Sequence, residues 1–133
     1  MNKNYNYRSW NSRELGFQPS LFPHVAIEKR GKEWIVYNKG RRIPLCTPKE
    51  SCAKKQHIYV YVDMVVDGKR MTGRRMALAA IIWLRYLGRE IAPGCVIDHI
   101  DENPFNNDPS NLQMLTIGDN TRKTYGHKIK KFL

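Results

Sequence analysis

The apolar residues of this chain come in short segments, and this limits what its 133 residues can fold into. The longest uninterrupted apolar segment, residues 76–84, lies between two arginines and is far shorter than the roughly 20 residues of a bilayer-spanning helix. The first residues contain no continuous apolar stretch, so neither a signal peptide nor a membrane anchor is expected. With 41% hydrophobic residues the chain can still fill a core. We therefore expect one compact folded domain with no membrane segment.

Strand-like segments separated by glycine turns dominate residues 23–73, which we expect to form a β-rich region. These segments are residues 24–27, 34–37, 58–62 and 64–66. The last one runs into Asp67-Gly68, a strong signal for a tight β-hairpin. Residues 1–22 are rich in Asn, Ser and Arg without a sustained period, and we expect an irregular basic arm there.

Residues 74–87 have the pattern of a helix that packs against a core. Thr72 is placed to cap its start, and Gly88 stands where a left-handed residue ends a helix. The apolar face of this helix consists of Ala77, Ile81 and Leu84, flanked by Ala80 and Leu87. Basic residues are expected at the helix ends, free to face phosphates: Lys69, Arg70, Arg74, Arg75 and Arg85. The expected fold class is α+β, with short antiparallel N-terminal strands, one core helix and a C-terminal unit completing residues 74–133.

The net charge indicates the class of partner, and the cysteine content indicates the redox compartment. Lys and Arg total 23 against 12 Asp and Glu, a formal net charge of +11, which suggests a polyanionic partner. The three cysteines, Cys46, Cys52 and Cys95, form no Cys-x-x-Cys pair, which argues against a disulfide framework and against a four-cysteine zinc site. Free thiols in a reducing, cytoplasmic compartment are expected.

One segment of this basic protein lacks basic residues altogether. Between Arg89 and Arg122 there is no Lys or Arg, yet the same segment holds half of all the acidic residues. Carboxylate and amide oxygens bind Mg²⁺ or Ca²⁺ best where no ammonium group competes, so this acidic segment is a sensible place for a hard divalent cation. From charge alone, acidic residues that only solvate loops explain the segment equally well.

The residue order within the acidic segment carries a motif. Its residues, in chain order, are Asp98-His99-Ile100-Asp101, Asn106-Asn107, Pro109, Asn111-Leu112 and Asn120. This pattern resembles the HNH endonuclease motif, and most closely the branch of phage and intron homing endonucleases in which Asn replaces the final His (an H-N-N variant). The resemblance implies a ββα-metal fold: a strand that ends at His99, a loop, a strand over residues 111–115 and a helix that carries Asn120. Thr116 agrees with this independently, because it can cap that helix.

The resemblance also implies roles for the site residues. Histidine is the side chain whose neutral form readily takes a proton from water near neutral pH, so His99 is expected to be the general base. Asp98 and Asn120 would hold one Mg²⁺ or Mn²⁺, and no zinc is expected. Asn111 would tie the loop to the strand that carries His99, and Asn107 would do a similar job in the loop.

Duplex DNA is the implied partner, inside a bacterial or phage-infected cell, and whether the protein is a monomer or a homodimer stays open. The residues expected to contact DNA are Arg70, Arg74, Arg75, Arg122, Lys123, Lys128 and Lys130. Several aromatic residues could stack on unpaired bases: Trp10, Trp34, Tyr37, Tyr59 and Tyr61. For Trp34 and Tyr59, a place in the core is the favoured interpretation.

Three functions are compatible with these features. The leading hypothesis is a metal-dependent HNH endonuclease that hydrolyses DNA, with a homing role favoured by the resemblance. The second is a non-catalytic DNA-binding or regulatory module that keeps the HNH fold. The third is a basic RNA-binding protein, which explains the charge of +11 but not the acidic segment.

Overall fold

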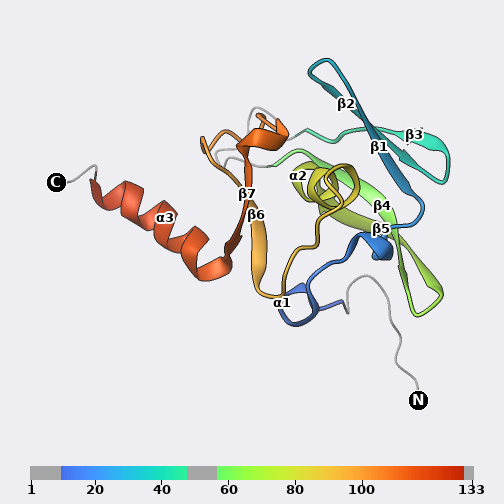
Figure 1. The fold of residues 1–133 in the computed structure, drawn as a ribbon, viewed down its shortest axis with the longest axis horizontal. Helices are drawn as coiled ribbons and strands as arrows, with labels where there is room; N and C mark the ends of the chain where they lie inside the picture. Colours follow the sequence, from blue (N-terminus) through green and yellow to red (C-terminus); the bar gives the residue numbers. More distant parts are fainter. Residues whose placement is uncertain (1–9, 48–56, 131–133) are drawn as a thin grey trace.

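The structure is a computed structural model that describes residues 10–47 and 57–130, with side chains up to Lys123. Its helical elements are α1 (Ser12–Leu15), the 3-10 turns η1 (Pro19–Leu21) and η3 (Pro109–Asn111), α2 (Leu78–Ile81), the π-helical turn η2 (Ile82–Tyr86) and α3 (Ile117–Lys130). Its strands are β1 (Val25–Arg30), β2 (Glu33–Asn38), β3 (Arg41–Ile43), β4 (Tyr59–Val66), β5 (Lys69–Ala77), β6 (Cys95–His99) and β7 (Leu112–Thr116). Helices and strands are mixed along the chain (Figure 1), which confirms the expected α+β class.

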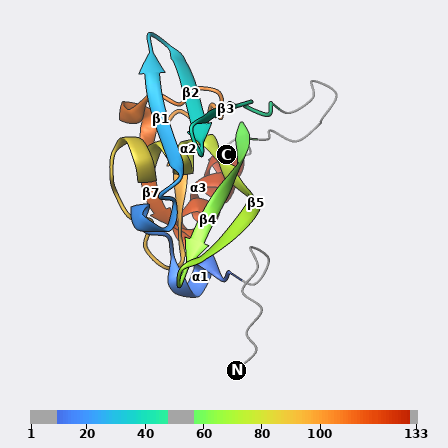
Figure 2. The same ribbon diagram turned by 90° about the vertical axis from the view of Figure 1, so that its right-hand side faces the viewer.

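The strands form three small antiparallel sheets, β1-β2-β3, β4-β5 and β6-β7. The predicted β4-β5 hairpin is confirmed: Val66 pairs with Lys69 across Asp67 and Gly68. The φ angles of these two turn residues are +50° and +76°, the positive values that a tight hairpin turn needs. The β1-β2 and β4-β5 hairpins extend in opposite directions from the helix between them (Figure 2).

The helix expected over residues 74–87 was wrong at its start, because β5 continues to Ala77 and helical structure begins only at Leu78. Thr72, expected to be the helix cap, instead lies with Gly73 in a β-bulge opposite Asp63 of β4. Gly73 has a φ of +72°, a left-handed conformation that a bulge uses and a right-handed helix start does not. Arg74 and Arg75 therefore belong to a strand and not to a helix end.

The arm expected over residues 1–22 was also wrong where the structure describes it, because residues 10–22 contain α1 and η1. Phe17 exchanges two backbone hydrogen bonds of 2.8 Å with Ile91. Phe22 is fully buried. The aromatic residues of this segment thus hold it against the core. Burying such rings stabilises the packed conformation by more than the polar residues around them destabilise it. Residues 1–9 lie outside the described part of the chain.

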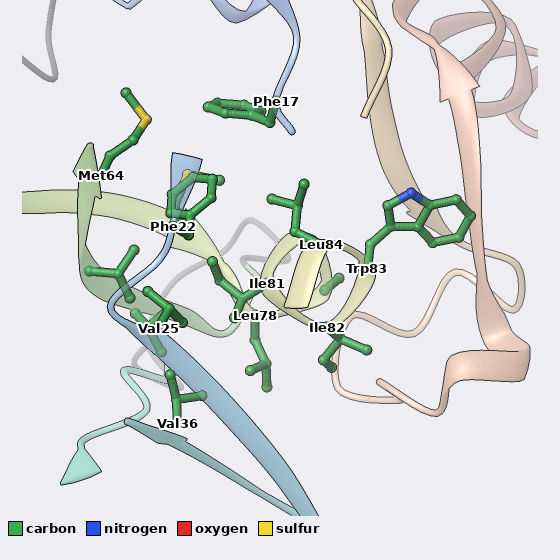
Figure 3. Close-up of a cluster of buried hydrophobic side chains, with 14 of the residues drawn as sticks. Phe17, Phe22, Val25, Val36, Met64, Leu78, Ile81, Ile82, Trp83 and Leu84 are labelled. Carbon is green, nitrogen blue, oxygen red and sulfur yellow. The ribbon is translucent and has the colours of Figure 1, made fainter. Parts of the chain in front are cut away.

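The core surrounds the short helix formed by α2 and η2. Side chains from the N-terminal segment and from β1, β2 and β4 gather around this helix (Figure 3). They include Phe17, Phe22, Val25, Val36 and Met64. Leu78, Ala79 and Ile82 lie outside the predicted apolar face and are at most 2% exposed, so the helix is buried on more than the one face that its periodicity predicts. Arg85 is part of this arrangement, because its Nε donates to Val25 O at 2.9 Å. It is therefore not free to face phosphates, as its position had suggested.

The helix α3 follows β7 directly, and its C-terminal part extends away from the rest of the molecule (Figure 1). Thr116 Oγ1 accepts a hydrogen bond of 3.0 Å from Asp119 N, which confirms the predicted cap. Lys128 and Lys130 lie on this helix, but their side chains are outside the described ones. Among the described residues, no helix has the length and apolar character needed to cross a bilayer.

Candidate active site

A β-hairpin followed by a helix frames the site. Strands β6 and β7 pair antiparallel from Cys95–Thr116 to His99–Leu112, and α3 runs on from β7. This arrangement returns the first turn of α3 to the end of β6. The result is an open pocket of about 200 Å³. Its lining residues are His57, Asp98, His99, Glu102, Pro104, Asn120 and Lys123. Three residues singled out in the sequence, Asp98, His99 and Asn120, therefore share one pocket.

The His99 ring is buried, with 3% of the residue exposed, and its hydrogen bonds define which nitrogen can accept a proton. Its Nε2 lies 2.8 Å from Asn107 Oδ1. The amide nitrogen of Asn107 donates to Pro104 O at 3.3 Å, so the amide oxygen is the atom that faces the ring. Nε2 must then carry the hydrogen, and Nδ1 keeps the lone pair. The ring is held in the tautomer that a general base needs.

Asn111 connects the two ends of the loop between β6 and β7. Its Oδ1 accepts from Asp101 N at 3.1 Å, and its Nδ2 donates to Asp101 Oδ1 at 2.8 Å and to Asn106 O at 2.9 Å. Hydrogen bonds from Asn106, from the Asn103 backbone and from Asn111 lower the pKa of Asp101 to about 2. Asp101 is therefore charged at neutral pH and serves the loop. Asn107, and not Asn111, makes the hydrogen bond to the His99 ring.

Asp98 faces a cation of the protein itself. Its Oδ2 accepts from Lys123 Nζ at 2.7 Å and from Gln113 Nε2 at 2.9 Å. The same ammonium group donates to His99 O at 3.1 Å and to Ile100 O at 3.4 Å. Three oxygen atoms thus surround a positive charge in the pocket. The expectation of a segment without a competing ammonium group was wrong, because Lys123, one residue beyond Arg122, lies on α3 and reaches back to Asp98.

His57 is a pocket residue that sequence reasoning missed. Its ring stacks on the His99 ring, with centroids 5.4 Å apart and 22° between the planes. Partial burial lowers the pKa of His57, the neighbouring His99 lowers it further, and Asp98 opposes the change. The sequence offers no motif at this position, because His57 lies about 40 residues from His99 and reaches it only through the fold.

The arginines expected to contact DNA have different surroundings. Arg70 lies 3.7 Å from the buried Asp63, and Arg75 lies over the Tyr59 ring at 4.0 Å. Arg74 is half-buried over the Phe17 ring, and desolvation lowers its pKa. Arg122 pairs with Asp119 on the exposed side of α3.

The donor set around the pocket fits a hard divalent cation. Asp98 and Asn120 offer a carboxylate and an amide oxygen, which Mg²⁺ accepts while it keeps several waters. The described residues contain no cluster of three or more His, Cys, Asp or Glu side chains, so solvent and substrate would complete the coordination. The position of Lys123 supports the fit, because it shows that the oxygens at Asp98 already hold a positive charge.

A hairpin and a helix that bring a histidine, a carboxylate and an amide to one pocket define a ββα class of site. Comparison with protein-family models agrees with this class, because residues 78–122 match the family described as HNH endonuclease. The part of the chain from α2 to the first turns of α3 is therefore similar to the HNH endonuclease family, as the motif predicted. Searches of curated proteins and of solved structures give no match.

Proposed function

We propose that the protein is a metal-dependent endonuclease that hydrolyses phosphodiester bonds of DNA. The observation that carries this proposal is the single pocket in which His99, whose Nε2 is bound to Asn107 and whose Nδ1 keeps the lone pair, lies beside Asp98 and Asn120. The HNH endonuclease match over the same residues supports it. The formal charge of +11 supports a polyanionic substrate.

The chemistry follows from the positions of these groups. Nδ1 of His99 takes a proton from a water molecule whose oxygen attacks phosphorus, and the bond from phosphorus to the leaving oxygen breaks. Asn107 holds the ring in the required tautomer, and Asn111 holds the loop that carries Asn107. Asp98 and Asn120 would bind Mg²⁺ or Mn²⁺, which supplies charge stabilisation at the phosphate and the leaving oxygen. A cation held by Asp98 would displace the ammonium group of Lys123, which would then be available to a phosphate.

The finer assignments rest on the resemblance. The homing type is proposed because Asn120 stands where many HNH enzymes have a histidine, and the proposed setting is the cytoplasm of a bacterial or phage-infected cell. One such pocket cuts one strand, so a double-strand break would need a second copy or a second event.

The decisive experiment incubates supercoiled plasmid with the wild-type protein and Mg²⁺, with and without EDTA. The expected result is conversion to nicked or linear plasmid that EDTA prevents. Binding to plasmid without cleavage under any metal tested would favour the non-catalytic DNA-binding module. Preferential binding or cleavage of structured RNA would favour the RNA-binding hypothesis.

Binding to duplex DNA should depend steeply on salt. Each phosphate neutralised by Lys or Arg contributes a slope of about −0.9 to log K against log salt concentration. Anisotropy titrations between low and moderate salt, in EDTA to prevent cleavage, measure this slope. Five or more phosphate contacts would give a slope of about −4.5 or steeper, whereas a flat response would contradict electrostatic binding.

Replacing Lys123 by Met is expected to tighten Mn²⁺ binding by about fivefold or more, because it removes the ammonium group that competes at Asp98. Isothermal titration of the metal into the free protein measures the affinity directly. Arg122→Met is the matched control, since it removes one positive charge from the same turn of α3 outside the pocket. Equal changes in both variants would show that only net charge matters.

A further inference from the structure

We propose that the outer face of β4, formed by Tyr59 and Tyr61 with Arg75 of β5, binds unpaired nucleotides of the DNA strand that enters the catalytic pocket. The proposal deepens the proposed function, on which it rests, by naming a substrate class: DNA with a single-stranded stretch beside the cleavage position. We call these three residues the stacking strip.

Strand alternation places the stacking strip on one face. Val60 and Val62 are at most 1% exposed and point into the core, so Tyr59 and Tyr61 point the other way. Tyr61 pairs directly with Arg75 across the β4-β5 sheet. The guanidinium of Arg75 lies 4.0 Å from the centre of the Tyr59 ring. The face therefore carries two aromatic rings and one cation side by side.

The Tyr61 ring is exposed in a way that packing in the core does not explain, whereas Tyr59 is half-buried. Tyr61 is 51% exposed although it lies in the middle of a strand. Its ring meets the Tyr59 ring edge-on, with centroids 5.6 Å apart and 86° between the planes. These contacts hold the rings in place, which lowers the entropy lost when a base stacks on them. Aromatic rings beside an arginine bind single strands by stacking bases and attracting the backbone.

The stacking strip is connected to the catalytic pocket through His57. This histidine precedes Tyr59 by two residues. The residue between them, Ile58, is fixed by the hydrogen bond of 2.8 Å that its carbonyl oxygen accepts from Leu78 N at the start of α2. His57 lines the catalytic pocket together with His99, and it also lines a neighbouring hollow of about 280 Å³ together with Arg75. A strand lying on the tyrosines would thus pass Arg75 and His57 before it reaches His99.

Base pairing decides which DNA this face can use. In a duplex both faces of each base are covered by neighbouring pairs, so an exposed tyrosine has nothing to stack on. Unpaired bases offer free faces, and stacking on an aromatic side chain does not depend on sequence. The stacking strip therefore favours single-stranded stretches such as flaps, gaps or frayed ends over continuous duplex.

The test measures binding in EDTA, where no cleavage is needed, so that a failure of the stacking strip and a failure of the proposed nuclease activity are distinguishable. Fluorescence anisotropy compares a 12-nucleotide single strand with the same sequence as a duplex. The variants are Tyr61→Ala, Tyr61→Phe and, as an exposed tyrosine of η2 that lines neither the pocket nor the hollow, Tyr86→Ala. Thermal unfolding of each variant verifies the fold.

We expect Tyr61→Ala to weaken single-strand binding about tenfold, in line with the loss of one stacked base. Tyr61→Phe and Tyr86→Ala should bind the single strand like the wild type, and duplex binding should be unchanged in all three. The proposal is overturned if Tyr61→Ala weakens single-strand and duplex binding equally, if it weakens neither, or if Phe fails to replace Tyr61. Tighter binding of an RNA single strand of the same sequence would assign the face to RNA instead.

Discussion

Replacing His99 by Ala should lower the rate of plasmid cleavage at least about 100-fold, because general-base catalysis contributes a factor of this size or more. The wild-type ring is 3% exposed and its Nε2 is bound to Asn107, which leaves Nδ1 as the atom that can take the proton. Single-turnover nicking of supercoiled plasmid in Mg²⁺ measures the rate. DNA binding, which does not use the ring, should stay within about twofold.

Asn107→Ala separates the role of the imidazole itself from the role of its tautomer. It leaves the imidazole in place but removes the acceptor that fixes the tautomer, so its loss of cleavage should be smaller than that of His99→Ala. Thermal unfolding of both proteins guards against misfolding, since both side chains are buried. Wild-type rates in a folded His99→Ala protein would refute the assignment of the base.

Gly16→Ala is expected to have the largest effect on stability, at least about 3 kcal/mol. Gly16 has a φ of +64° and a ψ of −160°, a combination essentially restricted to glycine. A Cβ at this position would lie 2.4 Å from Ile91 O and 2.9 Å from Pro93 N. Both atoms belong to backbone that cannot move without breaking the contacts between Phe17 and Ile91.

Gly31→Ala provides the matched control. Gly31 also has a positive φ, +59°, but a Cβ there would meet nothing within 4 Å. This variant should lose only about 1 kcal/mol from backbone strain. Urea denaturation of the wild type and both variants gives the three unfolding free energies. Similar losses in Gly16→Ala and Gly31→Ala would show that the steric contact at Ile91 is unimportant.

Features of the fold that depend only on neighbouring residues could be predicted from local signals in the sequence. The turn at Asp67-Gly68 and the cap at Thr116 each depend on neighbouring residues, and both were predicted correctly. The start of the core helix was not predicted correctly, because the sequence around Thr72 fits the pattern of a helix cap as well as that of a strand. Pairing with β4 decided in favour of a strand and placed Gly73 in a bulge. Such tertiary pairing overrides local propensity and is not visible in a window of sequence.

In the candidate site, too, the residues of the local motif were recognised from the sequence, whereas residues brought in by tertiary packing were not. Asp98, His99 and Asn120 carry the motif, and the fold brings them to one pocket. The two groups that modify this pocket could not be recognised in the same way. His57 reaches His99 from the segment that precedes β4. Lys123 cannot be distinguished in the sequence from the other basic residues of α3, and only the fold brings its side chain to Asp98. Their positions depend on how the segment before β4 and the helix α3 lie against the end of β6, which no single motif encodes.

The most direct test of the account is the plasmid nicking rate as a function of Mg²⁺ concentration for the wild type, Asp98→Ala and Glu102→Ala. Both acids line the same pocket, but only Asp98 is assigned to the metal. We expect cleavage that requires the metal, is lost in Asp98→Ala at every Mg²⁺ concentration, and is retained in Glu102→Ala with a similar midpoint. Cleavage that persists in EDTA, or that survives in Asp98→Ala, would contradict it.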